Sequence, residues 1–326
     1  MGQQGMMIDP QPGAHKVQLR SMAEYATDLA RSGVRILPGA AGTFWAEYQS
    51  GAMMRMPTFH LAPPTAQEIQ QVLWRRRAAI ASYLLEPDEC HPANAWLYLC
   101  TDRDYALEKL APEMRRNVRL GLKKLTISPL TADQLQAHGA PAFCETRRRL
   151  GLDDGTPEEF QRDLTAHASL PELVYLGAWK ENQLAAYLSI LEVEDWAEIA
   201  GTSSMDALRR YKPNDTLIYS ALSHYLVERG CRVVSYGLSS IQVESNPAGL
   251  HQFKTKVGFE ARPVHRAFVF HPLLRPFANG LMLRGMNTAL RFRPGAPRLR
   301  MARGILASAL GDTSVLEATA RSTNDE

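Results

Sequence analysis

The stretch Leu250-His-Gln-Phe-Lys-Thr-Lys-Val-Gly-Phe259 carries the clearest structural pattern in the sequence. Its first, fourth and eighth residues are apolar, and this spacing is typical of one face of an α-helix. Gly258 follows the last of them, at a position where a glycine commonly ends a helix. We therefore predict a helix over 248–257 that buries these three side chains, with Lys254 lying off the inward stripe.

Strand-like segments lie on both sides of this helix. The run Arg232-Val-Val-Ser-Tyr236 is rich in β-branched residues and ends at Gly237, and 264–270 has the pattern of a final strand. Farther towards the N-terminus, three apolar runs separated by short polar turns predict an antiparallel meander. These three runs are 173–179, 184–191 and 196–203.

Apolar doublets between residues 216 and 229 predict another helix, packed on one side. Asn214 or Asp215 can cap its start, and Gly230 can end it. A polar and basic loop over 205–215 precedes it.

The region from about 17 to 131 alternates strand-like and helix-like segments. The expected strands are 43–49 and 53–56, joined as a hairpin at Ser50-Gly51, followed by 79–85 and 95–100. The expected helices are 66–76 and 111–125, with two more between 132 and 169 that are separated by Gly151-Leu-Asp-Asp-Gly155.

The helix expected at 111–125 has a strongly basic face with five cations and no acid between them. Such a face is either simply solvated or turned towards an anion such as phosphate. The five cations are Arg115, Arg116, Arg119, Lys123 and Lys124.

In this order, the segments resemble the second half of the GNAT acyltransferase fold, in its FemAB-like branch. The resemblance is strongest over 205–270, covers most of 20–275, and includes a segment similar to the family's FK-x-x-x-G-F element. The matching segments are Lys212-Pro-Asn-Asp-Thr-Leu-Ile-Tyr219, Val227-Glu-Arg-Gly-Cys231, Val234-Ser-Tyr-Gly-Leu-Ser-Ser240, Leu250 to Phe259 and the basic helix Met114 to Lys124.

The resemblance implies an α/β (α+β) fold of two GNAT-like halves, with mixed, mostly antiparallel sheets flanked by helices. Residues 18–165 would form a degenerate first half and 166–272 the acyltransferase half. A flexible lead-in over 1–17 and a basic C-terminal tail over 273–326 would complete the chain.

The resemblance also implies an N-acyltransferase. Such an enzyme would move an acyl or aminoacyl group from acyl-CoA or charged tRNA to an amine of a small-molecule, lipid-linked, polysaccharide or cell-envelope precursor. The donor would be a co-substrate, and no cofactor would be bound permanently.

The donor-binding loop departs from the pattern of acetyl-CoA enzymes, which commonly carry a glycine-rich Q/R-x-x-G-x-G/A loop before the helix. This chain has Arg209-Arg-Tyr-Lys-Pro-Asn-Asp215 there, without a glycine. Ordinary CoA binding through backbone N–H groups is therefore in question, but side-chain charge and the helix dipole can still favour a phosphate. The candidate donor-binding residues are Arg209, Arg210, Lys212, Asn214, Asp215 and Thr216, and Arg116 and Arg119 are candidates for substrate contact.

Three residues are candidates for catalysis. By resemblance, Lys254 matches the lysine that faces the transferred carbonyl or the donor phosphate; the alternative is an ordinary exposed lysine. Tyr236 could protonate a leaving thiolate or ribose oxygen, or pack in the core. Glu198 could act as the general base, or face solvent.

Three further residues are candidates for substrate binding. Ser239 and Ser240 follow the strand that ends at Gly237, where hydroxyls bind a substrate or stabilise a turn. His251 is expected on the helix surface, where a histidine is usually only solvated.

The composition excludes several classes of protein. Among 326 residues, 37 Lys and Arg stand against 34 Asp and Glu, and a net charge of +3 does not indicate a DNA partner. Four scattered cysteines without a CxxC pair favour a reducing, cytoplasmic setting, and nine dispersed histidines predict no metal site. No signal-peptide pattern, membrane-spanning run, nucleophile elbow or phosphate-binding glycine motif is present.

The segment from 271 to 310 is basic and contains no acidic residue. It could lie on an anionic membrane at the inner face, or wrap the first half with its arginines in solvent. This segment supports the alternative function, a non-catalytic membrane-surface binding module on a GNAT scaffold. Its arginines are Arg275, Arg284, Arg291, Arg293, Arg298, Arg300 and Arg303.

Overall fold

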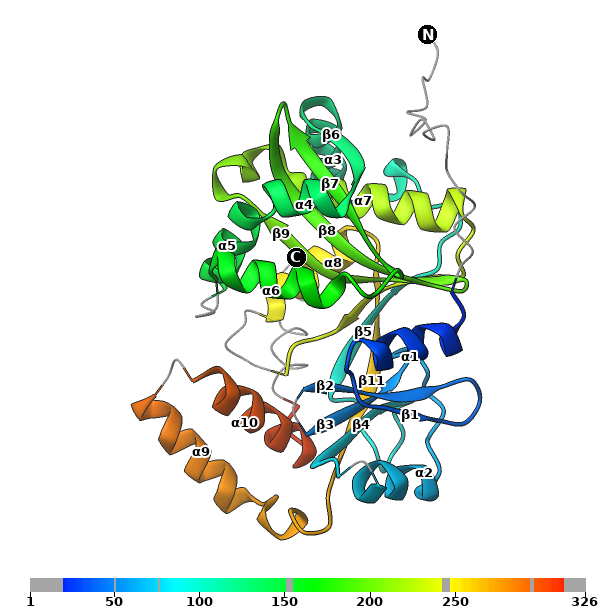
Figure 1. Ribbon diagram of the computed structural model, residues 1–326, viewed down its shortest axis with the longest axis vertical. Coiled ribbons are helices and arrows are strands. Elements are labelled where there is room, and N and C mark those ends of the chain that lie inside the picture. The colour runs from blue at the N-terminus through cyan, green and yellow to red at the C-terminus, as the bar shows by residue number, and fades with distance from the viewer. Residues whose placement is uncertain are drawn as a thin grey trace.

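The computed structural model describes residues 20–49, 51–75, 77–150, 155–241, 247–293 and 296–313. In these residues, eleven strands form one continuous sheet in the order β1-β2-β3-β4-β11-β5-β10-β9-β8-β7-β6 (Figure 1). The lead-in expected at 1–17, most of the 151–155 linker and the end of the chain lie outside the described residues.

The strands are mostly those that the sequence predicts. Their bounds are β1 Ile36–Pro38, β2 Phe44–Gln49, β3 Ala52–Met56, β4 Ile80–Leu85, β5 Ala95–Cys100, β6 Thr126–Leu130, β7 Leu173–Lys180, β8 Gln183–Val193, β9 Trp196–Ser204, β10 Val233–Leu238 and β11 Glu260–Phe270.

Helices cover both faces of the sheet and extend beyond its edge. Their bounds are α1 Met22–Arg31, α2 Ala66–Gln70, α3 Pro112–Lys124, α4 Ala132–His138, α5 Ala140–Arg149, α6 Pro157–His167, α7 Pro213–Leu222, α8 Pro247–Lys256, α9 Gly280–Phe292 and α10 Pro297–Ala309.

Strand β11 joins the two parts of the sheet. Residues 260–264 pair with β5, residues 265–270 pair with β4, and β10 pairs with the other side of β5. Most neighbouring strands are antiparallel; β3–β4 and β9–β10 are parallel. The expected mixed and mostly antiparallel α/β class is confirmed, with the sheet strands continuous rather than divided between two sheets.

The sequence analysis did not predict α1, β1, α9 or α10, and four further details differ from it. The 132–169 region forms three helices rather than two, because Gly139 divides α4 from α5 where its Cα lies against Leu135 and Phe160. Strand β6 was not expected because it contains Pro129, which an edge strand tolerates. Leu250 is 39% exposed rather than inward, whereas Val257 is fully buried as expected.

The fourth difference concerns the helix expected at 216–229, which begins earlier. Pro213 occupies the first turn of α7, a position that its fixed φ favours, and Lys212 precedes it with a left-handed φ of 59°. A wider π-helical turn over Ser223–Glu228 replaces the end of the expected α-helix. Asn214 and Asp215 therefore lie in the first turn instead of capping it.

The two faces of the sheet carry different helices. Adjacent residues on a strand point to opposite faces, and Leu188 of β8 packs in the core under α3 and α7 while Tyr187 packs with α5 and α6. The α3–α7 side is the larger core and includes the fully buried Leu217 and Leu222.

The C-terminal segment folds as a pair of helices, α9 and α10, beside the end of the sheet (Figure 1). Ile305 and Leu306 of α10 are buried, and Asn94 donates a hydrogen bond to Ser308 Oγ at 3.3 Å. Arg303 donates to Asn287 of α9 at 3.1 Å. No helix within the described ranges combines the length and hydropathy of a membrane span.

Candidate active site between strands β9 and β10

Strands β9 and β10 run parallel for three residue pairs and then diverge. Their pairing ends at Ser235 and Glu198, although β9 continues to Ser204. Beyond that point, β10 pairs through Leu238 with β5 instead. The point of divergence brings side chains of β5, β9, β10 and α8 together.

Lys254 of α8 lies at this point and is only 4% exposed. Its Nζ donates a hydrogen bond to the Tyr236 carbonyl at 2.8 Å and lies 4.1 and 4.5 Å from the ring centres of Tyr98 and Tyr236. Burial lowers the pKa of Lys254 to about 7, although the Glu198 carboxylate opposes this shift. The alternative of an ordinary exposed lysine is therefore wrong.

His251 is buried, and the expectation of a solvated surface histidine is also wrong. Its Nδ1 is hydrogen-bonded to the Tyr98 hydroxyl at 3.1 Å, and its ring packs against Trp96. Burial and the Lys254 charge lower the pKa of His251. The neutral imidazole of His251 therefore packs in the wall around Lys254.

Glu198 approaches Lys254 from β9. It shares a strand face with Trp196, opposite to Ala197, which lies in the α3–α7 core. The Thr58 hydroxyl donates a hydrogen bond to Glu198 Oε2 at 3.2 Å. Burial raises the pKa of Glu198, against the opposing effects of Thr58, Lys254 and Ser235.

Tyr236 closes the divergence on the side of the larger core. Its ring packs against Phe259, and its hydroxyl is hydrogen-bonded to Thr202 of β9. Burial raises the pKa of Tyr236 to about 12. At neutral pH, Tyr236 is thus a protonated phenol near Lys254.

The two candidate serines lie just beyond these residues. Ser239 is buried, its backbone N–H donates to the Trp96 carbonyl at 2.8 Å, and its Oγ accepts from the Trp96 N–H at 3.0 Å. Ser240 follows it and is half-buried. Ser239 therefore fastens the end of β10 to β5.

The cationic loop lies at the start of α7. Arg209 and Arg210 are exposed; Arg209 lies 3.8 Å from Asp206, and the Arg210 guanidinium lies over the Tyr211 ring. Lys212 is half-buried and precedes the helix. These side chains lie where the α7 dipole favours an anion.

The first turn of α7 is largely engaged in internal contacts. Asn214 donates to Ser204 Oγ at 3.4 Å, and Asp215 accepts a hydrogen bond from Asn117 of α3 at 2.9 Å. Burial raises the pKa of Asp215. Thr216 is fully buried and donates to the Lys212 carbonyl at 2.9 Å. Its side chain is therefore not available to a donor molecule at the surface.

Arg116 and Arg119 are exposed on α3, which packs against α7 and the 206–211 turn. They lie on α3, whereas Lys254 lies on α8 and Glu198 on β9. The candidates therefore fall into a buried cluster at the strand divergence and a basic surface formed by α3 and the loop before α7.

Several members of the buried cluster were not identified from the sequence. Tyr98 and Trp96 belong to an ordinary strand pattern, and Thr58 lies in a loop far away along the chain. Their role depends on the pairing of β5 with β10 and β11, and no local signal predicts it.

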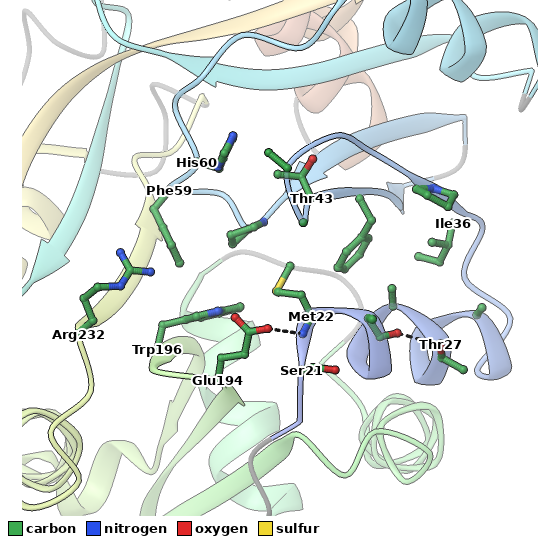
Figure 2. A pocket seen from close by; sticks show the side chains of 18 of the residues that line it. Ser21, Met22, Thr27, Ile36, Thr43, Phe59, His60, Glu194, Trp196 and Arg232 are labelled. Carbon is green, nitrogen blue, oxygen red and sulfur yellow. Dashed lines mark hydrogen bonds between the residues drawn. The ribbon is translucent and has the colours of Figure 1, made fainter.

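A cavity of about 850 Å³ is lined in part by Trp196, which shares a strand face with Glu198 (Figure 2). It lies between α1, the β1–β2 region, the 57–61 loop and the beginning of β9. Phe59 and Trp196 pack edge to face at 5.3 Å in its wall. We call it the α1 groove.

Within the described parts of the chain, no group of three or more His, Cys, Asp or Glu side chains is arranged to hold a metal ion.

No family model and no curated protein sequence matches this chain. Among solved structures, FemX has a TM-score of 0.55 at 11% identity, covering 77% of this chain and 92% of FemX. The C-terminal domain (DUF2156) assigned as a lysylphosphatidylglycerol synthetase from Agrobacterium fabrum has a TM-score of 0.51 at 15% identity, covering 82% and 96%. The chain has the FemAB-like GNAT fold. The expected resemblance is confirmed at the level of the fold. In this fold, Lys254 lies where strands β9 and β10 diverge.

Proposed function

We propose that the protein is an acyltransferase that moves an acyl or aminoacyl group from an activated donor to an amine at the β9–β10 divergence. The observation that carries the proposal is the buried Lys254, held beside Glu198 and under Tyr98 and Tyr236. Perturbed titratable groups brought together in this way are typical of catalytic sites.

The reaction forms a C–N bond and breaks the C–S bond of a thioester or the C–O bond of an aminoacyl ester. The acceptor amine attacks the donor carbonyl carbon and gives one proton to the Glu198 carboxylate. The Lys254 ammonium stabilises the negative charge that develops on the carbonyl oxygen. The leaving group takes up a proton from Lys254 or Tyr236.

The two acids suit different leaving groups. Tyr236, with a pKa of about 12, is too weak an acid to protonate a thiolate efficiently, because the corresponding thiol has a pKa of about 8.5. It can protonate a more basic alkoxide. Lys254, with a pKa of about 7, can protonate either. We therefore test both acyl-CoA and charged tRNA as donors. We place the phosphates of either donor at Arg209, Arg210 and Lys212.

The acceptor is an amine of a small-molecule, lipid-linked or cell-envelope precursor. The names of the two structural neighbours support the choice of aminoacyl donors and lipid acceptors for the assay. Arg116 and Arg119 are proposed to contact an anionic part of a bound substrate, since they extend the basic surface around the start of α7.

The test is transfer of a radiolabelled acyl group from acetyl-CoA, palmitoyl-CoA and aminoacyl-tRNA to a panel of amines. Lys254→Met is expected to lower the rate about 10²–10³-fold, in the range seen when an oxyanion-stabilising group is removed. Lys256→Met, the half-buried lysine two residues away, is the matched control. Absence of transfer from every donor, or full activity of Lys254→Met, would contradict the proposal.

We propose peripheral contact with an anionic membrane as a second function, compatible with a cytoplasmic protein at the inner face. The surface between 273 and 293 combines exposed apolar side chains with arginines, and residues 261–311 contain no acid. Such a surface favours the interface of an anionic bilayer. Its exposed apolar residues are Leu273, Leu274, Phe277, Leu281, Met282 and Phe292.

Liposome flotation tests this contact. The wild type is expected to float with anionic vesicles at low salt and less at high salt, and Leu281→Ser/Phe292→Ser should reduce binding at least fivefold. Leu150→Ser/Val227→Ser removes two exposed apolar side chains elsewhere and should bind as the wild type does. Equal binding by both double variants, or dimerisation through this face instead, would reject the membrane contact.

A further inference from the structure

The α1 groove has the features of a binding site for an apolar ligand. Its volume of about 850 Å³ falls in the range of small-molecule pockets, and most of its lining is apolar with a few polar groups. Neither the residues expected from the sequence nor the proposed catalytic cluster uses it.

One wall of the groove is a row of small residues on α1. Ala23, Ala26 and Ala30 recur at spacings of three and four, so they lie along one side of the helix and leave room beside it. From Ser21 to Ala30 this wall is about 14 Å long at 1.5 Å per residue. Further apolar lining comes from Phe44, Pro57, Phe59, Leu61 and Trp196. Figure 2 shows Phe59 and Trp196 near the start of α1.

The groove carries little unbalanced charge. Arg232 is paired with Asp195 at 3.0 Å and lies over the Phe59 ring, while Glu194 accepts the Met22 N–H at 2.9 Å. The lining thus favours an extended apolar body over an anionic one.

One end of the groove adjoins Glu198. Thr58, which donates to Glu198, lies between Pro57 and Phe59 of the lining, and Trp196 lies two residues before Glu198 on the same strand face. Glu198 itself does not line the groove, but it is half-buried and its carboxylate lies near this end.

We propose that the α1 groove binds the aliphatic body of the acceptor and directs its amine to Glu198. This inference rests on the proposed acyltransferase function and specifies its acceptor class, a primary amine on an extended aliphatic chain. The chain could come from a membrane lipid or from a soluble alkylamine, and both present the same chemistry to the groove.

Binding is measured without turnover, by calorimetry of the full chain with n-decylamine and n-butylamine below their aggregation limits. The wild type should bind decylamine at least tenfold more tightly, because the added methylenes leave water. Apolar burial should also give a negative heat-capacity change for decylamine.

Two variants fill the groove. Ala26→Phe and Ala30→Phe should each reduce the preference for decylamine to less than threefold, and the exposed Ala30 tolerates a larger side chain even where Ala26→Phe fails to fold. Ala166→Phe changes an exposed alanine of α6 and should keep the full preference. Equal affinity of the wild type for the two amines, or an unchanged preference in a folded Ala30→Phe, would overturn the proposal.

The transfer assay separates the two proposals and the two chain sources. Binding of decylamine without transfer leaves the groove assignment standing and rejects the acyltransferase. Transfer without any dependence on chain length rejects the groove assignment alone. Transfer to decylamine in solution would show that the groove accepts a soluble alkylamine. Transfer only to an aminolipid in vesicles would show that it accepts the chain of a membrane lipid. In either case, Ala30→Phe should lower the rate.

Discussion

At the scale of single residues, Lys254 combines a proposed catalytic position with an energetic penalty. It is almost completely buried, and its ammonium has a carbonyl and two aromatic rings as neighbours. An amine in such a place loses hydration, which is why its pKa falls to about 7. Residues that destabilise the fold in this way are commonly kept for function.

We predict that Lys254→Met makes the protein more stable at pH 7 by about 1–3 kcal/mol, because the buried ammonium no longer loses its hydration. Between pH 7 and about 10.4, the unfolded wild type binds one more proton than the native one, so wild-type stability rises with pH in this window. The advantage of the variant should therefore shrink from pH 7 to pH 10 in thermal unfolding. A constant difference across these pH values would mean that Lys254 is not desolvated.

Thr58 provides a residue-scale test of Glu198 as the base. Thr58→Val removes a hydrogen bond that favours the charged carboxylate, so the pKa of Glu198 should rise further. A base must be deprotonated, and the acidic limb of the kcat/KM profile should therefore move to higher pH, with a roughly two- to tenfold loss at neutral pH. Thr165→Val, at an exposed threonine of α6 that donates to the Gln161 carbonyl, is the control. An unshifted limb would exclude Glu198 as the titrating base.

At the scale of elements, the contact between α3 and α7 fixes the loop that carries the cations. Gly121 of α3 faces Thr216 of α7 so closely that an added Cβ would lie 1.8 Å from Thr216 Oγ1. Asn117 and Asp215 form a hydrogen bond in the same contact. The start of α7 is therefore positioned by α3 as well as by its own sequence.

Gly121→Ala should lower the free energy of unfolding by about 1–3 kcal/mol, because the close contact between helices must open. Gly285→Ala in α9 meets nothing within 4 Å and should be neutral or slightly stabilising. Denaturant unfolding of the two variants gives the comparison. Similar stability of both would show that α3 and α7 are not in close contact.

At the scale of the whole molecule, α1 is fastened to the beginning of β7 by two buried carboxyl groups. Glu172 is 2% exposed and Asp28 is 5% exposed, and the two carboxyl groups interact with one another. Arg31 lies 2.8 Å and Arg20 4.0 Å from Asp28. Burial, together with Asp28, raises the pKa of Glu172. This pair holds the wall of the α1 groove against the rest of the sheet.

Glu172→Gln should stabilise the protein at pH 7–8 by about 1 kcal/mol, since the amide needs no proton to pair with Asp28. For a carboxyl whose folded pKa is raised, the native state binds more protons above the unfolded pKa, so wild-type stability falls as pH rises through the folded value. The stability difference from wild type should grow from pH 5 to pH 8 in thermal unfolding. The exposed Glu260→Gln of β11 should show no such trend; a flat difference for Glu172→Gln would refute the raised pKa of Glu172.

The sequence by itself determined the local elements and the family resemblance. The meander, the β10 strand and the FK-x-x-x-G-F helix follow from periodicity and from Gly258, because these signals act over a few residues. The family resemblance indicated Lys254, and the expected strand positions indicated Tyr236 and Glu198; the structure brings these three residues together.

Only the tertiary structure decided how those candidates are surrounded. The burial of Lys254 and His251 depends on Tyr98 and Trp96 of β5, which reach them because β11 crosses between the two parts of the sheet. Thr58 and most of the α1 groove lining come from the N-terminal region, more than a hundred residues from Glu198. A helical period shows which residues share a face, but burial of that face depends on pairings across the whole chain, and no local pattern contains them.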